Sequence, residues 1–159
     1  MRKRFEIQLE LGHCPIEDIK IPTNSRDELP PVLRSLQEIY TNAELSAKIF
    51  EIMERNILLV HKGRPGMSLW QILVLGVVRS TLNTNYDRVH LMANYDMLVR
   101  QLLGHSLTTL VPEKQYSLQS IKDNVGLLTE GMLDEINEAV VSYGHSVKKK
   151  PRGPRRSSI

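Results

Sequence analysis

Residues 69–78 form the most apolar stretch of the chain, and this stretch limits the folds that the sequence can adopt. Gln71 is its only polar residue, and Ser68 stands directly before it in the position of a helix N-cap. A helix that is apolar nearly all round must be buried at the centre of a protein or within a bilayer. A membrane span needs roughly 18 residues, about twice the length of this stretch. The sequence therefore predicts a buried central helix over residues 69–80.

Further helices are predicted around this one, because apolar residues recur at helical spacing between capping and turn residues. Aromatic residues make up only 5% of the chain, which favours packed helices over aromatic-rich strands. We expect an all-α, multi-helix bundle. The other helices are expected from Ser25 or Asp27 to about Tyr40, from a capping box at Thr41 and Glu44 to near Val60, over residues 86–94, from Asp96 to before Gly104, from Ser117 to about residue 127, and from Thr129 to Gly144.

The N-terminal end has a different pattern. Apolar and polar residues alternate over residues 5–11, which predicts a short strand, although the sequence offers it no partner strand. Residues 12–24 contain two prolines and predict an extended connector that is held to the body by Ile16, Ile19 and Ile21. We therefore divide the chain into an extended segment (residues 1–24), a helical DNA-binding domain (residues 25–147) and a tail (residues 148–159).

The tail concentrates the positive charge of the chain. It carries six basic residues and no acidic one, whereas the net charge of the whole chain is +3, so the remaining residues sum to −3. With almost no apolar residue to bury, the tail is expected to be disordered. Such a tail can neutralise phosphates, but it cannot hold side chains in a geometry that distinguishes bases.

The sequence contains no pattern of a metal, nucleotide or catalytic site. Cys14 is the only cysteine, and the five histidines lack the paired spacing of a zinc site. Gly63 and Gly66 precede a helix, but the lysine and the spacing of a phosphate-binding loop are missing. We expect no metal, no cofactor and no catalytic residue. The first residues do not form a signal peptide, which predicts a cytoplasmic protein with no membrane association.

Two segments have the outline of a DNA-reading helix. The helices predicted over residues 69–80 and 86–94, with a short turn between them, resemble a helix-turn-helix unit. The second helix would expose Asp87, Arg88, His90 and Asn94. A rival recognition helix starts after Ser117 and carries Gln119 and Lys122 on a polar face. Helical hairpins are common, so a bundle without DNA contacts is the alternative to both.

A long series of residues resembles the N-terminal region of bacterial insertion-sequence DDE transposases. The main match is the run KGRPGMSLWQILVLGVVR, residues 62–79. Shorter matches are SRDELPP at residues 25–31, NYDR at 85–88, Ala93-Asn94, LLG at 102–104 and SIKDNV at 120–125. The resemblance covers about residues 4–150.

The resemblance implies a DNA-binding function. In this family the N-terminal helical region is thought to bind the terminal inverted repeats, and a following ribonuclease-H-like domain holds two metal ions. Residues 151–159 depart from the family pattern, so we expect a chain that lacks the catalytic domain and is not an enzyme by itself. It would be nucleoid-associated in a bacterium. The candidate DNA-contacting residues are Lys62, Arg64, Arg79, Arg88, Asn94, Gln119, Lys122, Lys148, Lys149, Lys150, Arg152, Arg155 and Arg156.

Two other functions stay open at this point. The chain could be a helical oligomerisation module that forms homo-oligomers or pairs with an intact transposase, or it could be an inert remnant of a degenerate gene. Retention on inverted-repeat DNA over scrambled DNA would distinguish the DNA-binding function from both.

Overall fold

The computed structural model describes Arg4 and residues 15–24, 26–57, 67–105 and 115–149, with the backbone alone described from residue 144 onward. These residues contain helices and no strand, so the predicted all-α class is confirmed. The strand predicted over residues 5–11 lies outside the described residues. The elements are η1 (Ile16–Asp18), α1 (Leu29–Thr41), α2 (Ala43–Ile57), α3 (Leu69–Leu82), α4 (Tyr86–Tyr95), α5 (Met97–Leu102), α6 (Leu118–Val125) and α7 (Glu130–Lys149).

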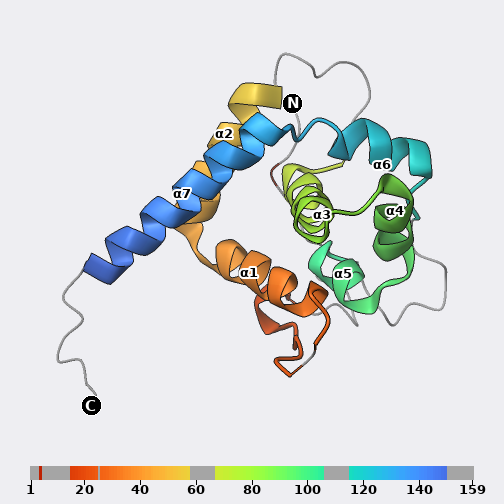
Figure 1. Cartoon of the computed structure of the whole chain (residues 1–159), viewed down its shortest axis with the longest axis horizontal. Coiled ribbons are helices and arrows are strands. Elements are labelled where there is room, and N and C mark those ends of the chain that lie inside the picture. The colour runs from red at the N-terminus through yellow and green to blue at the C-terminus, as the bar shows by residue number, and fades with distance from the viewer. Residues whose placement is uncertain (1–3, 5–14, 25, 58–66, 106–114, 150–159) are drawn as a thin grey trace.

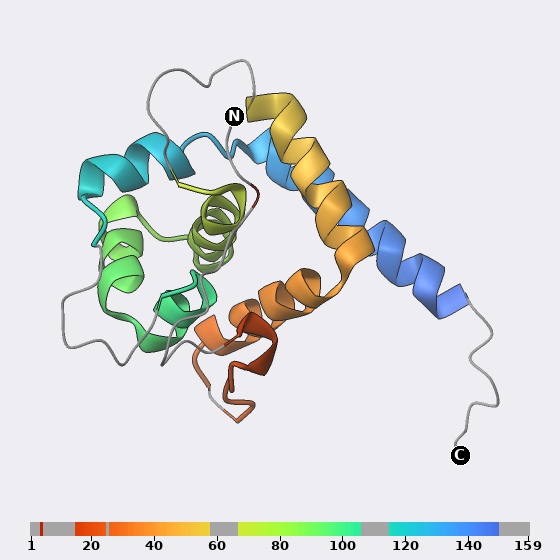
Figure 2. The ribbon, with the colours of Figure 1, turned by 180° about the vertical axis from the view of Figure 1, so that it is seen from behind.

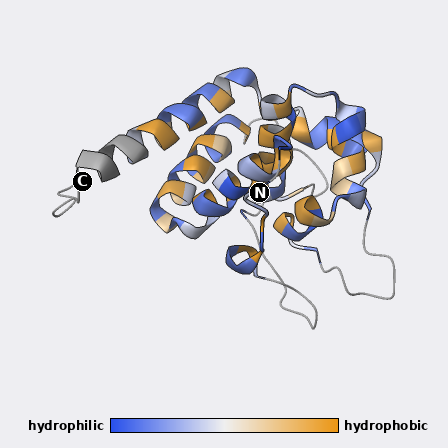
Figure 3. Ribbon diagram, turned by 60° about the horizontal axis from the view of Figure 1, so that its bottom comes forward, coloured by the Kyte–Doolittle hydropathy of each residue, from blue (hydrophilic) through white to orange (hydrophobic). Residues whose placement is uncertain are grey.

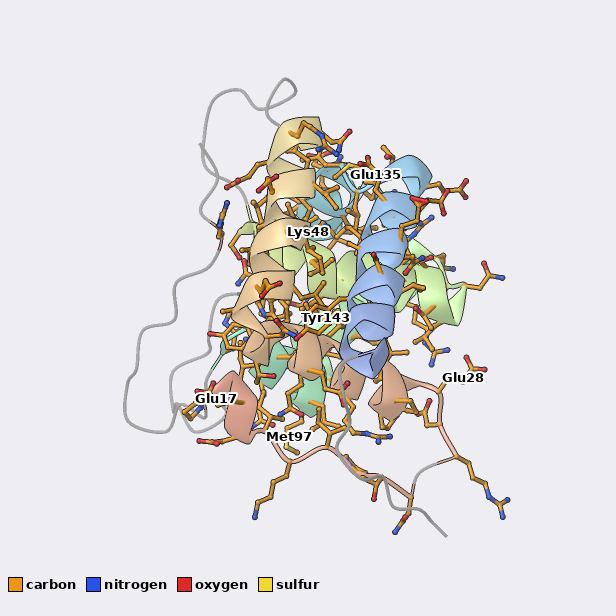
Figure 4. The ribbon with its side chains drawn as sticks, turned by 90° about the vertical axis from the view of Figure 1, so that its left-hand side faces the viewer. Glu17, Glu28, Lys48, Met97, Glu135 and Tyr143 are labelled. Carbon is orange, nitrogen blue, oxygen red and sulfur yellow. The ribbon has the colours of Figure 1, made fainter. Side chains whose placement is uncertain are left out.

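Helix α3 is the centre of the fold, as its apolar sequence predicts. Helices α1, α2, α4 and α6 all contact it, and α4, α5 and α6 lie together on one side of it (Figure 1). On the other side, α2 and α7 run antiparallel and pack along each other, as Figures 1 and 2 show from opposite directions. Figure 4 shows the α2–α7 pair with Lys48 on α2 and Glu135 and Tyr143 on α7. The end of α7 extends beyond the rest of the body (Figure 2).

The burial pattern explains why α3 occupies this position. Its side chains are buried on nearly every face, and Ile72, Leu73, Val74 and Leu75 are each 0% exposed. The surrounding helices α1, α2 and α7 have an apolar stripe and a polar stripe, visible as orange and blue bands in Figure 3. Amphipathic helices of this kind can cover an all-apolar helix with one face and contact water with the other.

The first turn of α3 connects it to α5 by hydrogen bonds. Ser68 and Gln71 form the capping box that satisfies the start of the helix, each side chain accepting from the other's backbone N–H. The Trp70 indole N–H also donates to the Leu102 carbonyl (2.8 Å), and the Gln71 amide donates to the Leu103 carbonyl (3.1 Å). The last carbonyls of a helix have no partner inside that helix. Side chains of α3 therefore supply the hydrogen-bond donors for two carbonyl groups at the C-terminal end of α5.

Three details differ from the sequence-based expectations. The cap of α2 is Asn42, whose side chain accepts from the Leu45 N–H, and not Thr41, whose hydroxyl donates to the Glu38 carbonyl. Gly144 does not end α7, which continues to Lys149. The central helix continues to Leu82, two residues beyond the expected end.

The N-terminal segment is held to the body at two places. Ile16 and Ile19 are buried, as expected, and the Gln37 amide on α1 donates to both of their carbonyls (2.8 and 2.9 Å). The Arg4 guanidinium donates to both carboxylate oxygens of Glu54 on α2 (3.0 and 2.9 Å), which lowers the pKa of that carboxyl. This contribution to stability is present at neutral pH and is lost as the pH falls through the lowered pKa.

The position of α3 predicts a large difference between two identical substitutions. Leu75→Asp places a charge without a partner in the core, which should cost more than about 3 kcal/mol and unfold the body. Leu91→Asp on α4 is the matched control, because Leu91 is 56% exposed, and it should change stability by about 0.5 kcal/mol or less. Thermal melts followed by circular dichroism measure both. Equal melting temperatures would show that α3 is not the core.

Candidate nucleic-acid interface

A tight turn joins α3 to α4. Asn83 adopts a left-handed conformation (φ 50°). Its backbone N–H donates to the Ser80 carbonyl, and the Thr84 N–H donates to the Arg79 carbonyl, both in the last turn of α3. Asn85 then caps α4, its side chain accepting from the Arg88 N–H (2.9 Å). The three residues between the helices thus supply hydrogen-bond partners to the C-terminal end of α3 and to the N-terminal end of α4. The orientation of α4 relative to α3 is fixed by this turn and by the packing between the two helices.

The outer face of α4 combines one cation with apolar groups. Arg88, Leu91 and Tyr95 follow each other at intervals of three and four residues, so they lie on one side of the helix. Leu91 is 56% exposed and Tyr95 is 70% exposed. A surface hollow lies along this face, lined by residues that include Thr84, Arg88, Leu91 and Tyr95. In the described part of the chain, the Arg88 guanidinium has no hydrogen-bond or ion-pair partner. It is therefore available to a ligand.

Asn94, predicted from the sequence to face outward on α4, is buried. Its amide donates to the Tyr116 carbonyl (2.9 Å), and its oxygen accepts from the Tyr116 N–H (2.7 Å). The Tyr116 hydroxyl is in turn hydrogen-bonded to His105 Nε2 (2.6 Å). Asn94 therefore joins α4 to the backbone of Tyr116, and the expectation that it is exposed on the outer face of α4 is wrong. Of the other residues expected on the exposed face, Asp87 and Arg88 are exposed and His90 is half-buried.

Arg79 lies in the last turn of α3 and stacks on an aromatic ring. Its guanidinium carbon is 4.1 Å from the ring centroid of Tyr86, the first residue of α4. The Tyr86 hydroxyl reaches α6, since a Cβ built at Gly126 would lie 3.6 Å from it. The Arg79 side chain is half-buried at the junction of α3 and α4.

Helix α6, the rival recognition helix, exposes a face on which a polar side chain is already hydrogen-bonded to a carboxylate. The Gln119 amide donates to the Asp123 carboxylate (2.8 Å), one turn along the helix. Lys122 is exposed beside them. Asn124 points inward, where its oxygen accepts from the Met67 N–H and its amide donates to the Ser120 carbonyl. Asp123 on this face repels phosphates, but Asp87 and Asp96 line the hollow on α4 and do the same. The carboxylates therefore do not distinguish the two helices, and α4 differs from α6 by its unpaired Arg88 and its exposed Leu91 and Tyr95.

The remaining candidate residues are not placed at the interface. Lys148 and Lys149 belong to the end of α7, of which the backbone alone is described. Lys62, Arg64, Lys150, Arg152, Arg155 and Arg156 lie outside the described residues.

Three residues of this region were missed in the sequence analysis. Tyr86 and Leu91 were assigned to a helix without a role, and Tyr95 lies one residue beyond the expected end of that helix at Asn94. The spacing of Arg88, Leu91 and Tyr95 was a usable signal, since it puts a cation and two large apolar groups on one helix face. No spacing pattern in the sequence indicated that Tyr86 would contact Arg79, because the two residues belong to different helices.

The described residues contain no group of three or more His, Cys, Asp or Glu side chains that could hold a metal ion. None of the described helices combines the length and the apolar character that crossing a bilayer requires. Comparison with models of known protein families, with curated protein sequences and with solved structures finds no match for this chain.

The inward position of Asn94 predicts a structural effect. Asn94→Ala removes both partners of the Tyr116 backbone and should cost about 1–3 kcal/mol in the free energy of unfolding. Asn137→Ala is the matched control, because Asn137 is exposed on α7, and it should stay within about 0.5 kcal/mol of the parent. Urea titrations give both values. Similar midpoints for the two variants would contradict the role assigned to Asn94.

Proposed function

We propose that this chain binds double-stranded DNA through α4, in the way that the N-terminal region of an insertion-sequence transposase is thought to bind terminal inverted repeats. The observation that carries the proposal is the outer face of α4, with its unpaired arginine and its exposed Leu91 and Tyr95, held on α3 by a three-residue turn.

The dimensions of α4 support this role. Its ten residues span about 15 Å, and a single helix with its side chains fits the major groove, which is about 12 Å wide. In helix-turn-helix proteins the first residues of the second helix contact the base edges. Arg88 occupies this place in α4, and arginine is the residue that most often contacts guanine in the major groove. Leu91 and Tyr95, farther along the same face, present apolar surface that can contact thymine methyl groups.

A second candidate function is association with another protein chain. It is favoured by the exposed large apolar residues Leu91, Tyr95 and Met97, which follow one another on α4 and at the start of α5. Exposed apolar residues that adjoin one another often mark protein interfaces. In this case the partner would be a second copy of the chain or an intact transposase.

The DNA-binding proposal predicts a loss of sequence preference when Arg88 is removed. Arg88→Ala should lower the ratio of affinities for repeat-end and scrambled duplexes, at a cost of roughly 1–3 kcal/mol if the side chain contacts a base. Lys48→Ala, on the α2–α7 side of the molecule (Figure 4), should leave the ratio unchanged. Fluorescence anisotropy with labelled duplexes that carry the ends of the element around its own gene, at fixed salt, measures the ratio. A parent protein that does not distinguish the two duplexes contradicts the proposal.

The association candidate is tested by sedimentation velocity without DNA. A single chain has a mass of 18.2 kDa. A dimer at micromolar concentration that is lost in Tyr95→Asp, while the circular dichroism spectrum is retained, would support association through α4. A parent protein that sediments as one chain at all concentrations, both alone and when mixed with an intact transposase, would exclude this candidate.

A further inference from the structure

A hollow opens on the surface where α1, α3 and α7 meet. Its volume is about 350 Å³, at the lower end of the roughly 300–1,000 Å³ of pockets that bind small molecules, so it has room for a side chain of another molecule. None of its described lining residues carries a charge. Most of them are apolar, and Ile39, Val77 and Val140 are only partly buried. The packing of one chain therefore leaves apolar surface uncovered at this place.

The exposed side of α7 next to this hollow carries a regular series of residues. Successive members are four and three residues apart in alternation, a spacing that puts them on one side of a helix. Asn137 belongs to the series and also lines the hollow. Val141, one turn farther along, is 56% exposed although it is apolar. The series, called here the α7 seam, consists of Glu130, Asp134, Asn137, Val141, Gly144 and Lys148.

The charges of the α7 seam are ordered by sign along the helix. Its first two residues are acidic, its middle is uncharged and its last residue is basic. Two parallel copies of the seam would place like charges side by side, whereas two antiparallel copies place opposite charges together. With the copies aligned on Ala139, the opposed pairs are Lys148 with the partner's Glu130, Gly144 with the partner's Asp134, and Val141 with the partner's Asn137.

We infer that α7 is an antiparallel dimer interface between two copies of this chain, with Val141 of each copy placed at the hollow of the other. One two-fold axis beside Ala139 relates the two seams, so the contact is isologous. Because Ala139 is near the middle of α7, the two helices overlap along their whole length. The end of α7 that extends beyond the body (Figure 2) then lies along the start of the partner's α7.

A second copy fits this surface better than a small ligand does. The α7 seam is about 27 Å long, so it continues well past the hollow in both directions. Its acidic start and basic end match each other, which makes the same chain a suitable partner. The apolar groups at the hollow supply buried area, and the charged ends set the direction of pairing. Helices α7 and α4 lie on opposite sides of α3 (Figure 1), so the inference does not rest on the proposed DNA binding.

The first test measures self-association of the full chain by sedimentation equilibrium without DNA. The parent should reach twice the 18.2 kDa mass of one chain. Val141→Asp should raise the dissociation constant about a hundredfold, because the symmetric contact loses one buried valine from each copy. Ser142→Asp is the matched control, since Ser142 is exposed and lies about 100° around the helix from Val141. It should leave the dissociation constant unchanged.

The second test addresses the direction of pairing. Lys148→Glu should raise the dissociation constant about tenfold at low salt, because it places a carboxylate beside the partner's Glu130 in both halves of the dimer. Lys149→Glu is the matched control. Lys149 interacts with the helix dipole as Lys148 does, but it lies about 100° away from the seam. An equimolar mixture of Lys148→Glu and Glu130→Lys chains should dimerise as the parent does, since each variant then faces an opposite charge.

The outcomes decide the inference in either direction. A parent that sediments as one chain at every concentration overturns it, and so does a dimer that Val141→Asp leaves intact. Equal weakening by Val141→Asp and Ser142→Asp, with the circular dichroism spectrum retained, overturns the assigned face. Equal effects of Lys148→Glu and Lys149→Glu overturn the antiparallel pairing. A dimer that depends on Val141 and Lys148 supports the inference even if the parent binds no duplex and the proposed function fails.

Discussion

The burial of α3 is the constraint on which the other elements depend. A helix that is apolar on nearly every side loses free energy of folding wherever it meets water, at about 25 cal/mol for each Å² of apolar surface left exposed. It therefore needs cover from several directions. The cover consists of α1 and α2 on one side and α4 and α6 on the other. Its few polar groups lie at its two ends. Ser68 and Gln71 form the cap at one end, and Arg79 lies at the other.

The same constraint brings the candidate interface into position. Helix α4 has only a modest apolar face of its own, formed by Val89, Met92 and Ala93. It is held by that face and by the turn after α3, so its opposite side has no role in folding. A short helix that is fixed in this way can present side chains to a ligand without conformational change. This is a requirement for accurate recognition, because the geometry of the contacts is set before binding.

Most of the fold could be predicted from the sequence, because the signals were local. Ser68, Asp96 and Ser117 each stand one residue before an apolar helical pattern, and each caps a helix in the structure. The errors have physical causes. Thr41 and Asn42 are both good capping residues, so sequence alone could not distinguish them. A glycine costs only about 1 kcal/mol inside a helix, so Gly144 was a weak signal for the end of α7.

The candidate site could be predicted only in part. The exposure of Arg88 was predicted correctly, because its position on an amphipathic helix is a local property. Asn94 was misassigned because its partner is the backbone of Tyr116, 22 residues later, and no local pattern shows where the chain returns. The stack of Arg79 on Tyr86 depends on the angle between two helices. That angle is set by the left-handed Asn83 and by packing against α6, and neither can be read from residue types.

The hydrogen bonds of Tyr116 also join parts of the chain that are separate in sequence. The Tyr116 hydroxyl is hydrogen-bonded to His105, and the Tyr116 backbone is hydrogen-bonded to Asn94 on α4. His105 and Tyr116 are therefore held at the same place on the body, and the amide of Asn94 is the group that attaches this place to α4. Loss of that amide would loosen both residues from α4 together, although they are far apart along the chain.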